Sequence, residues 1–201
     1  FRPGDRVMAD MSWPTNGIPG VLGGVPTNAA SIEIQRIHSG KLIHVPEEMS
    51  DPVAAAFVLG AQTSQALVRR LDIDSGDMVL IMAATSNTSM FVAQALSARG
   101  ARVHGVTLST NAHDLKGMGY ERVFPAADLQ SKDGSLVRYV ADIGGFRAVV
   151  DPFSNIYLER SLSMLGFFGR YVTCGMVDQG PLMTSRRSTT FTFEQVLNML
   201  I

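Results

Sequence analysis

The stretch that decides the fold is Met78-Val79-Leu80-Ile81-Met82-Ala83-Ala84-Thr85-Ser86-Asn87-Thr88-Ser89, followed by a helical pattern from Met90 to Arg99. Its apolar first half predicts a buried strand, its small polar middle a tight turn, and its end a helix. A strand, a turn and a helix in this order open a dinucleotide-binding unit. The turn carries Ser, Asn, Thr and Ser, where such turns are usually rich in glycine. Whether it still holds a pyrophosphate separates a redox enzyme from a scaffold of the same shape.

Strand and helix patterns alternate over the rest of the chain. We expect strands at 78–83, 102–107, 121–124, 146–151 and 169–175, and helices at 88–99, 111–118, 133–142 and 155–166. The strands at Met78–Met82 and Ala148–Val150 are almost continuously apolar. Such strands are buried on both faces, as in a parallel sheet covered by helices. The predicted fold class is therefore α/β, a doubly wound parallel sheet of the Rossmann type.

The first fifty residues have a different pattern. Residues 17–26 hold four glycines and two prolines, which predicts a loop. Polar and apolar residues alternate over 31–37, which predicts a half-buried strand, and 41–46 reads as another short strand. A helix should begin near Ser50, with Pro52 in its first turn, and extend over 53–70 as one segment or as two interrupted near Gly60.

Composition narrows the classes of partner. The net charge of −1 offers no electrostatic attraction for nucleic acid or for an anionic membrane, and no apolar run approaches the ~20 residues that span a bilayer. Cys174 is the only cysteine, so the chain can build neither an internal disulfide nor a cysteine-based zinc site. A single cysteine fits a reducing compartment, and we expect a cytoplasmic protein that acts on a small-molecule substrate.

A series of short motifs, in their order and spacing, resembles the medium-chain dehydrogenase/reductases, and most closely their zinc-free quinone-oxidoreductase and enoyl-reductase branch. The motifs are Gly4-Asp5-Arg6-Val7, Pro46-Glu47-Glu48-Met49-Ser50, Ala54-Ala55-Ala56, Ser75-Gly76-Asp77-Met78-Val79-Leu80-Ile81, Gln94-Ala95-Leu96-Ser97-Ala98-Arg99-Gly100-Ala101-Arg102-Val103, Val149-Val150-Asp151 and Gly169-Arg170-Tyr171-Val172-Thr173-Cys174-Gly175.

In that family a GroES-like catalytic domain is split around a Rossmann domain. The resemblance implies that residues 1–50 are the remnant of a GroES-like β domain and that residues 51–201 are the Rossmann dinucleotide-binding domain, without its C-terminal return segment. We therefore expect a piece of a longer protein. The family's structural-zinc cysteines would fall within residues 1–30, where there is no cysteine. A catalytic metal is disfavoured, and no metal ligand is assigned.

The cofactor turn of the zinc-free branch resembles Ala-x-x-Gly-x-x-Gly. Ala84 matches its first position, while Ser86 or Asn87, and then Ser89, stand where glycine is expected. Asn tolerates a positive φ, so Asn87 can preserve the turn, and the hydroxyls of Ser86, Thr88 and Ser89 can donate hydrogen bonds to phosphate. These five residues are assigned to cofactor binding. The alternative is that the hydroxyls cap the following helix and bind nothing.

The end of the second strand predicts which cofactor is used. NAD-preferring sites place a carboxylate there, about 20 residues past the first glycine, to hold the adenine ribose. Thr107 takes that position and does not repel a 2′-phosphate, so NADP is expected. The basic residue of similar proteins corresponds to Asn111 here. Lys116 and Arg122 are nearby substitutes, although an ordinary solvated role fits each of them.

Two further strand ends complete the predicted cofactor site. Asp151-Pro152-Phe153-Ser154-Asn155 keeps the aspartate that the family places near the nicotinamide ribose, but lacks the glycines that usually follow it. In Thr173-Cys174-Gly175-Met176, the resemblance implies that Gly175 lets the backbone approach the nicotinamide and that Met176 packs beside it. For Cys174 we expect a small buried side chain rather than a reactive thiol.

No catalytic residue can be assigned. The four histidines, His38, His44, His104 and His113, form no metal-binding helical pair and are expected to be surface or strand residues. In the zinc-free branch hydride passes directly from the nicotinamide to a conjugated carbonyl or quinone, and the proton donors would belong to the domain part that this chain lacks.

The resemblance implies an NADPH-dependent, zinc-independent oxidoreductase that reduces an activated double bond, a quinone or a carbonyl. The alternative is a non-catalytic domain with impaired cofactor binding, kept as a structural or docking element. An enoyl reductase could also be one part of a multidomain synthase whose acyl substrate is bound to a carrier. The family often forms homodimers through the Rossmann sheet edge, here after Thr184, where 189–193 alternates suitably; the alternative is that this segment is a simple connector.

Overall fold

The computed structural model describes residues 1–10, 33–108, 115, 117–154 and 158–174. The chain divides into two compact units, Phe1–Thr63 and Ser64–Ile201. Helix α1 (Asp51–Leu71) contributes its first part to one unit and its last part to the other. Within these described residues, no helix is long and apolar enough to cross a membrane.

In the first unit, a two-stranded antiparallel sheet joins residues far apart in the chain. β1 (Val7–Ala9) pairs with β2 (Leu42–His44), and Met8 lies opposite Ile43. A 3-10 turn, η1 (Ser39–Lys41), leads directly into β2. The first helical hydrogen bond of α1 runs from the N–H of Ala54 to the carbonyl of Ser50, which places the helix start where the sequence predicted it.

The second unit is built on five parallel strands, in the order β5-β4-β3-β6-β7. They are β3 (Met78–Ile81), β4 (Arg102–Thr107), β5 (Tyr120–Pro125), β6 (Phe146–Val150) and β7 (Leu165–Val172). In the central strand, Val79, Leu80 and Ile81 are completely buried. Burial on both faces explains why this strand shows no polar alternation in the sequence.

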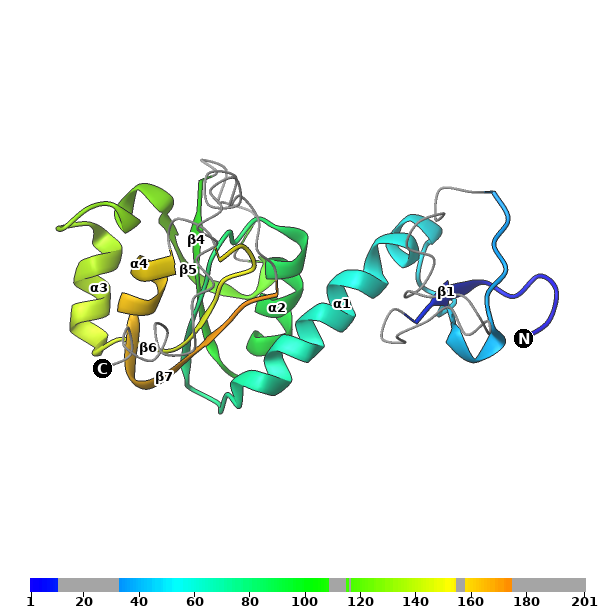
Figure 1. Cartoon of the computed structure of the whole chain (residues 1–201), viewed down its shortest axis with the longest axis horizontal. Helices are drawn as coiled ribbons and strands as arrows, with labels where there is room; N and C mark the ends of the chain where they lie inside the picture. Colours follow the sequence, from blue (N-terminus) through cyan, green and yellow to red (C-terminus); the bar gives the residue numbers. More distant parts are fainter. Residues whose placement is uncertain (11–32, 109–114, 116, 155–157, 175–201) are drawn as a thin grey trace, which may run out of the picture. The chain divides into compact units, whose positions relative to one another are not determined.

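Helices cover both faces of this sheet (Figure 1). On one face, the end of α1 and helix α2 (Asn87–Ser97) pack on Val79 and Ile81. On the other face, Leu80 and Phe146 belong to the core that includes η3 (Ala126–Leu129) and α3 (Ser135–Ile143). A short helix, α4 (Leu158–Ser163), precedes β7. The prediction of a doubly wound parallel sheet is confirmed.

Some predicted boundaries in the second unit are wrong. The last strand spans Leu165–Val172 rather than 169–175, and α4 ends at Ser163 rather than at 166. The strand begins early because Gly166 packs directly against the backbone of Gly144 and Gly145, where a β-carbon would come within 2.9 Å of a carbonyl oxygen. The predicted helix at 111–118 falls mostly outside the described residues.

The structure also decides two predictions for the first unit. The predicted strand at 31–37 is wrong over its described part, since residues 33–37 are not in a strand and Ile34 is 86% exposed. Alternation alone cannot make a strand without a backbone partner. Between the one-helix and two-helix alternatives, the structure shows one continuous helix, with Gly60 inside α1.

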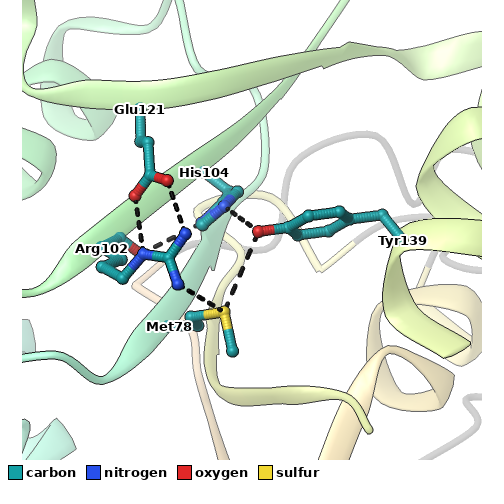
Figure 2. Close-up of polar contacts among 5 residues, drawn as sticks. All are labelled: Met78, Arg102, His104, Glu121 and Tyr139. Carbon is teal, nitrogen blue, oxygen red and sulfur yellow. Dashed lines mark hydrogen bonds and ion pairs between the residues drawn. The ribbon is translucent and has the colours of Figure 1, made fainter. Parts of the chain in front are cut away.

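A buried histidine lies in the middle of the core, on β4 (Figure 2). The Nδ1 atom of His104 lies 3.0 Å from the carbonyl oxygen of Arg102, and its Nε2 atom lies 2.8 Å from the hydroxyl of Tyr139. A carbonyl can only accept, so Nδ1 carries the proton and Nε2 accepts from Tyr139. Beside this pair, the guanidinium of Arg102 binds the carboxylate of Glu121 at 2.6 Å. His104 is thus a fully partnered neutral imidazole.

The burial of His104 predicts acid sensitivity of the fold. Burial lowers its pKa below the ordinary value of 6.5, so the unfolded chain binds the proton more tightly than the folded chain does. Stability contributed by this group is fully present above pH 6.5 and is lost as the pH falls from there through the lower folded pKa. We expect a slope of up to about 1.4 kcal/mol per pH unit in that window.

Urea unfolding of the parent and of His104→Gln between pH 7.5 and 5 measures this slope. The variant should lose it, whereas His44→Gln, which removes an exposed histidine, should keep it. An unchanged slope in His104→Gln would contradict the assignment.

Candidate functional site

A cavity of about 320 Å³ lies at the carboxyl ends of β3, β4 and β6. Because β3 pairs with β4 on one side and with β6 on the other, the connections that follow these strands leave toward opposite faces. Open α/β sheets bind ligands at this switch point. The cavity is lined by Met82, Ala83, Thr85, Ser86, Val106, Thr107, Leu108, Ala126, Leu129, Asp151 and Phe153.

The turn after β3 forms one wall of the cavity, and its backbone differs from the prediction. The left-handed residue is Ala83, with φ of +50°, and not Asn87. Asn87 is instead the first residue of α2. The expectation that Asn87 preserves the turn through a positive φ is therefore wrong. The turn is anchored to the sheet because the N–H of Ala84, which is fully buried, donates to the carbonyl of Val106 at 2.8 Å.

Two serines of this turn bind each other rather than facing the cavity with free hydroxyls. Ser86 is the N-cap of α2, and its Oγ accepts from the N–H of Ser89 at 3.1 Å. The Ser86 hydroxyl donates to Ser89 Oγ at 2.8 Å, and the Ser89 hydroxyl donates to the carbonyl of Met82 at 3.0 Å. Both hydroxyl protons are used within the protein. For these two residues the capping alternative describes the structure, and phosphate donation from their hydroxyls does not.

The start of α2 still offers backbone donors. The first N–H groups of a helix have no acceptor within the helix. Here the Ser86 hydroxyl oxygen accepts a hydrogen bond from one of them, the N–H of Ser89. The N–H groups of Asn87 and Thr88 therefore stand at the positive end of the helix dipole, next to the cavity-lining Ser86. A helix start of this kind favours an anion through its backbone, whatever the side chains do.

Thr107 ends β4 and also lines the cavity. Its side chain is buried, and its hydroxyl oxygen lies 3.4 Å from that of Thr85. Arg122, which the sequence offered as a substitute for the missing basic residue, is not on the cavity wall. Its guanidinium lies over the rings of Phe124 and Tyr139, at 4.6 and 5.0 Å from their centres. That alternative is wrong, because a cation–π contact holds the side chain elsewhere.

The turn after β6 forms a third wall. The buried carboxylate of Asp151 accepts through Oδ1 from the N–H groups of Phe153 and Ser154, at 3.0 and 3.1 Å. Its Oδ2 accepts from the hydroxyl of Tyr171 at 3.0 Å and from that of Ser161 at 3.5 Å. Four donors satisfy the buried carboxylate, which forms no ion pair with any described residue, and the same bonds shape the turn that carries Phe153.

The predicted site residues fall into four groups. Ser86, Thr107 and Asp151 line the cavity, whereas Ala84 and Ser89 are buried behind its wall, and Asn87 and Thr88 begin α2. Asn111, Gly175 and Met176 lie outside the described residues, as do Lys116 and the predicted dimer strand.

Cys174 differs from its prediction. The thiol is exposed rather than buried. Partial desolvation, and then the charge of Asp151, raise the pKa of the Cys174 thiol, so the thiolate is disfavoured. In the described part of the chain, no three His, Cys, Asp or Glu residues gather where they could hold a metal ion.

Sequence reasoning missed several residues of the cavity. Ala83 and Thr85 lie in the turn after β3 but match no position of the cofactor motif. Leu108, Leu129 and Phe153 are apolar, so no polar side chain marked them as site residues. The only usable signal was position, since residues that follow parallel strands gather at one edge of the sheet.

The lining is suited to part of a dinucleotide. About 320 Å³ lies at the small end of the range for small-molecule sites, which are mainly apolar with few polar groups. Here the polar residues of the lining are Thr85, Ser86, Thr107 and Asp151, beside the start of α2. No lysine or arginine is among the described residues of the lining.

The N-cap contact can be tested on its own. We expect Ser86→Ala to lower the free energy of unfolding by about 1 kcal/mol, because the N–H of Ser89 loses its acceptor. Thr88→Ala removes a hydroxyl from the same turn without removing the cap, and should change it by less than about 0.5 kcal/mol. Urea unfolding at pH 7.5 measures both. Equal losses would argue against the cap.

Curated relatives match large parts of the chain. A reducing polyketide synthase from Floropilus chiversii is 30% identical over 169 residues, which are 78% of this chain and 7% of that protein. The acryloyl-coenzyme A reductase of Metallosphaera sedula is 27% identical over 146 residues, which are 73% of this chain and 42% of that protein. The chain thus spans less than half the length of either relative.

Solved structures show the same fold. The quinone oxidoreductase from Thermus thermophilus, determined also as a complex with NADPH, superposes with a TM-score of 0.60 at 25% identity, over 72% of this chain and 47% of that one. The family model described as zinc-binding dehydrogenase matches residues 88–198, more than half of the chain. With the ordered motifs and the Rossmann sheet, this match establishes that the chain belongs to the zinc-binding dehydrogenases of the medium-chain dehydrogenase/reductase family.

Proposed function

We propose that this chain is the cofactor-binding part of an NADPH-dependent, zinc-independent oxidoreductase that reduces an activated double bond, a quinone or a carbonyl. The observation that supports this most is the cavity at the switch point, between the start of α2 and the Asp151 turn. Family membership supports a nicotinamide cofactor, and the NADPH complex of the Thermus thermophilus enzyme supports NADPH.

Each wall of the cavity has a role in this proposal. The N–H groups of Asn87 and Thr88 hold the pyrophosphate, Thr107 faces the adenine ribose, and the Asp151 turn faces the nicotinamide half. For Gly175 and Met176, which lie outside the described residues, the sequence resemblance alone suggests a contact with the nicotinamide. The cofactor, when bound, supplies a hydride. The residues of this chain bind it, orient it and exclude water, whereas proton donors come from outside the Rossmann unit.

The names of the relatives favour one class of substrate. An acryloyl-coenzyme A reductase and a reducing polyketide synthase point to the conjugated double bond of an acyl thioester, rather than to a free quinone. We propose further that residues 1–50 are a remnant of the GroES-like catalytic domain and residues 51–201 the Rossmann domain. The antiparallel β1–β2 pair supports the β character of the former.

Cofactor binding is the direct test. NADPH fluorescence should change on titration with the full-length protein, and NADPH should be oxidised when an enoyl thioester or a quinone is added. The backbone donors at α2 give the physical reason for binding. No binding at millimolar NADPH would contradict the proposal.

Thr107→Asp tests the choice of cofactor. A carboxylate at the end of β4 would repel the 2′-phosphate and accept from the ribose hydroxyls of NADH. We expect the ratio of the NADPH to the NADH dissociation constant to rise by about tenfold or more, which corresponds to about 1.4 kcal/mol. Thr107→Asn, of similar size but uncharged, is the control and should change the ratio far less. Equal effects would place the 2′-phosphate elsewhere.

The second candidate is a non-catalytic docking or structural domain. The observation that favours it is the mutual hydrogen bonding of Ser86 and Ser89, which leaves neither hydroxyl proton for a phosphate. The double variant Ser86→Gly/Ser89→Gly separates the two candidates. NADPH binding that appears only in this variant supports the docking domain. Binding by the parent supports the enzyme.

A further inference from the structure

Both turns that form the cavity walls contain a strained residue. Ala83 has a φ of +50° and Ser154 a φ of +44°, in the left-handed region that disfavours side chains. Such a conformation costs roughly 1–2 kcal/mol per residue, and it persists only where neighbouring contacts hold it. In each turn, the contacts lead back to a tyrosine on a strand of the sheet, Tyr120, which is buried, or Tyr171, which is partly buried.

Tyr120 holds the first turn. It begins β5 and is only 3% exposed. Its hydroxyl lies 3.0 Å from the carbonyl oxygen of Ala84 and 3.2 Å from that of Ser89, so its one proton is shared between two carbonyls at the two ends of the turn. Gly105 makes room for the ring, because a β-carbon there would lie 2.9 Å from it and 2.7 Å from the Ala84 side chain.

Tyr171 holds the second turn. Its hydroxyl donates to Asp151 Oδ2 at 3.0 Å and lies 2.9 Å from Ser154 Oγ. The tyrosine proton goes to the carboxylate, which can only accept, so in this contact the Ser154 hydroxyl donates to the tyrosine oxygen. The carboxylate in turn accepts the N–H groups of Phe153 and Ser154. The strained residue is therefore fixed through its backbone and its side chain.

The hydroxyls of Tyr120 and Tyr171 stay protonated and can therefore donate hydrogen bonds. Burial raises the pKa of both Tyr120 and Tyr171 well above its ordinary value of 10, so neither loses its proton in the physiological range. Neither tyrosine lines the cavity. Their hydroxyls act on ligand binding only through the turns.

We propose that Tyr120 and Tyr171 are a pair of positioning residues, each of which holds one of the two glycine-poor turns in the shape that forms the ligand cavity. Where glycine would adopt a left-handed backbone freely, this chain uses alanine and serine and fixes the turns from the sheet by tyrosine hydroxyls. The ligand, NADPH, rests on the proposed function, whereas the restraint of the turns does not.

Amide hydrogen exchange of the ligand-free protein, resolved by residue, tests the restraint. Tyr120→Phe should speed exchange of the Ala84 and Ser89 amides about fivefold or more and leave those of Phe153 and Ser154 unchanged. Tyr171→Phe should produce the converse pattern. Both changes remove one oxygen and keep the ring.

Tyr139→Phe is the matched control. It removes the same atom from a third tyrosine, one bonded to His104 at a distance from both turns. It should leave both pairs of amides unchanged. Equal acceleration of the two turns in Tyr120→Phe or Tyr171→Phe would overturn the proposal, because it would indicate a general loss of stability. So would acceleration of neither.

NADPH titration provides the second measurement. The dissociation constant should rise about fivefold in each of Tyr120→Phe and Tyr171→Phe and stay unchanged in Tyr139→Phe. A parent that does not bind NADPH contradicts the proposed function, while the exchange pattern still decides whether the tyrosines hold the turns. A parent that binds, with unchanged affinity in both variants, overturns the positioning role alone.

Discussion

The pairing of β3 with β4 on one edge and with β6 on the other is the constraint on which the rest of the structure depends. All three strands are parallel, so each needs a crossover, and crossovers are right-handed. The chain therefore leaves β3 through α2 on one face of the sheet and leaves β6 through α4 on the other (Figure 1). The two connections diverge at the carboxyl ends of the strands. The cavity lies where they separate.

The walls of the cavity show how a turn can persist when its glycines are replaced. A residue other than glycine is strained in a left-handed backbone conformation, but polar side chains in the same turn can offset that strain through hydrogen bonds. Ser86 and Ser89 link the turn to the start of α2, and Asp151 links the second turn to β7. In both places, polar groups that have left water are satisfied inside the protein. The family relationship and the absent glycines are thus compatible in one structure.

The same bonding limits what the site can do. Hydroxyls that serve the fold cannot also donate to a ligand, so an anion at the start of α2 depends on backbone N–H groups and the helix dipole. A buried imidazole on β4 follows the same rule away from the cavity. His104 is tolerated because a carbonyl and a tyrosine hydroxyl satisfy both of its nitrogens. Acid conditions disturb that balance because a second ring proton gives the imidazole a charge that burial disfavours.

The sequence by itself determined the succession of strands and helices, the Rossmann class and the family. Near-continuous apolar strands such as Val79–Ile81 are explained by burial on both faces alone, and residues after parallel strands must gather at one edge. Thr107 and Asp151 lie at the cavity for that reason. Tertiary structure alone decided that the left-handed residue is Ala83 rather than Asn87, that Ser89 points inward, and that Arg122 lies over two aromatic rings. Each of these depends on partners that lie far along the chain, or on the path the backbone takes between two packed strands. The local conformational preference of a residue contributes less free energy than these long-range contacts. Local preference therefore allows several conformations, and the assembled fold selects one of them.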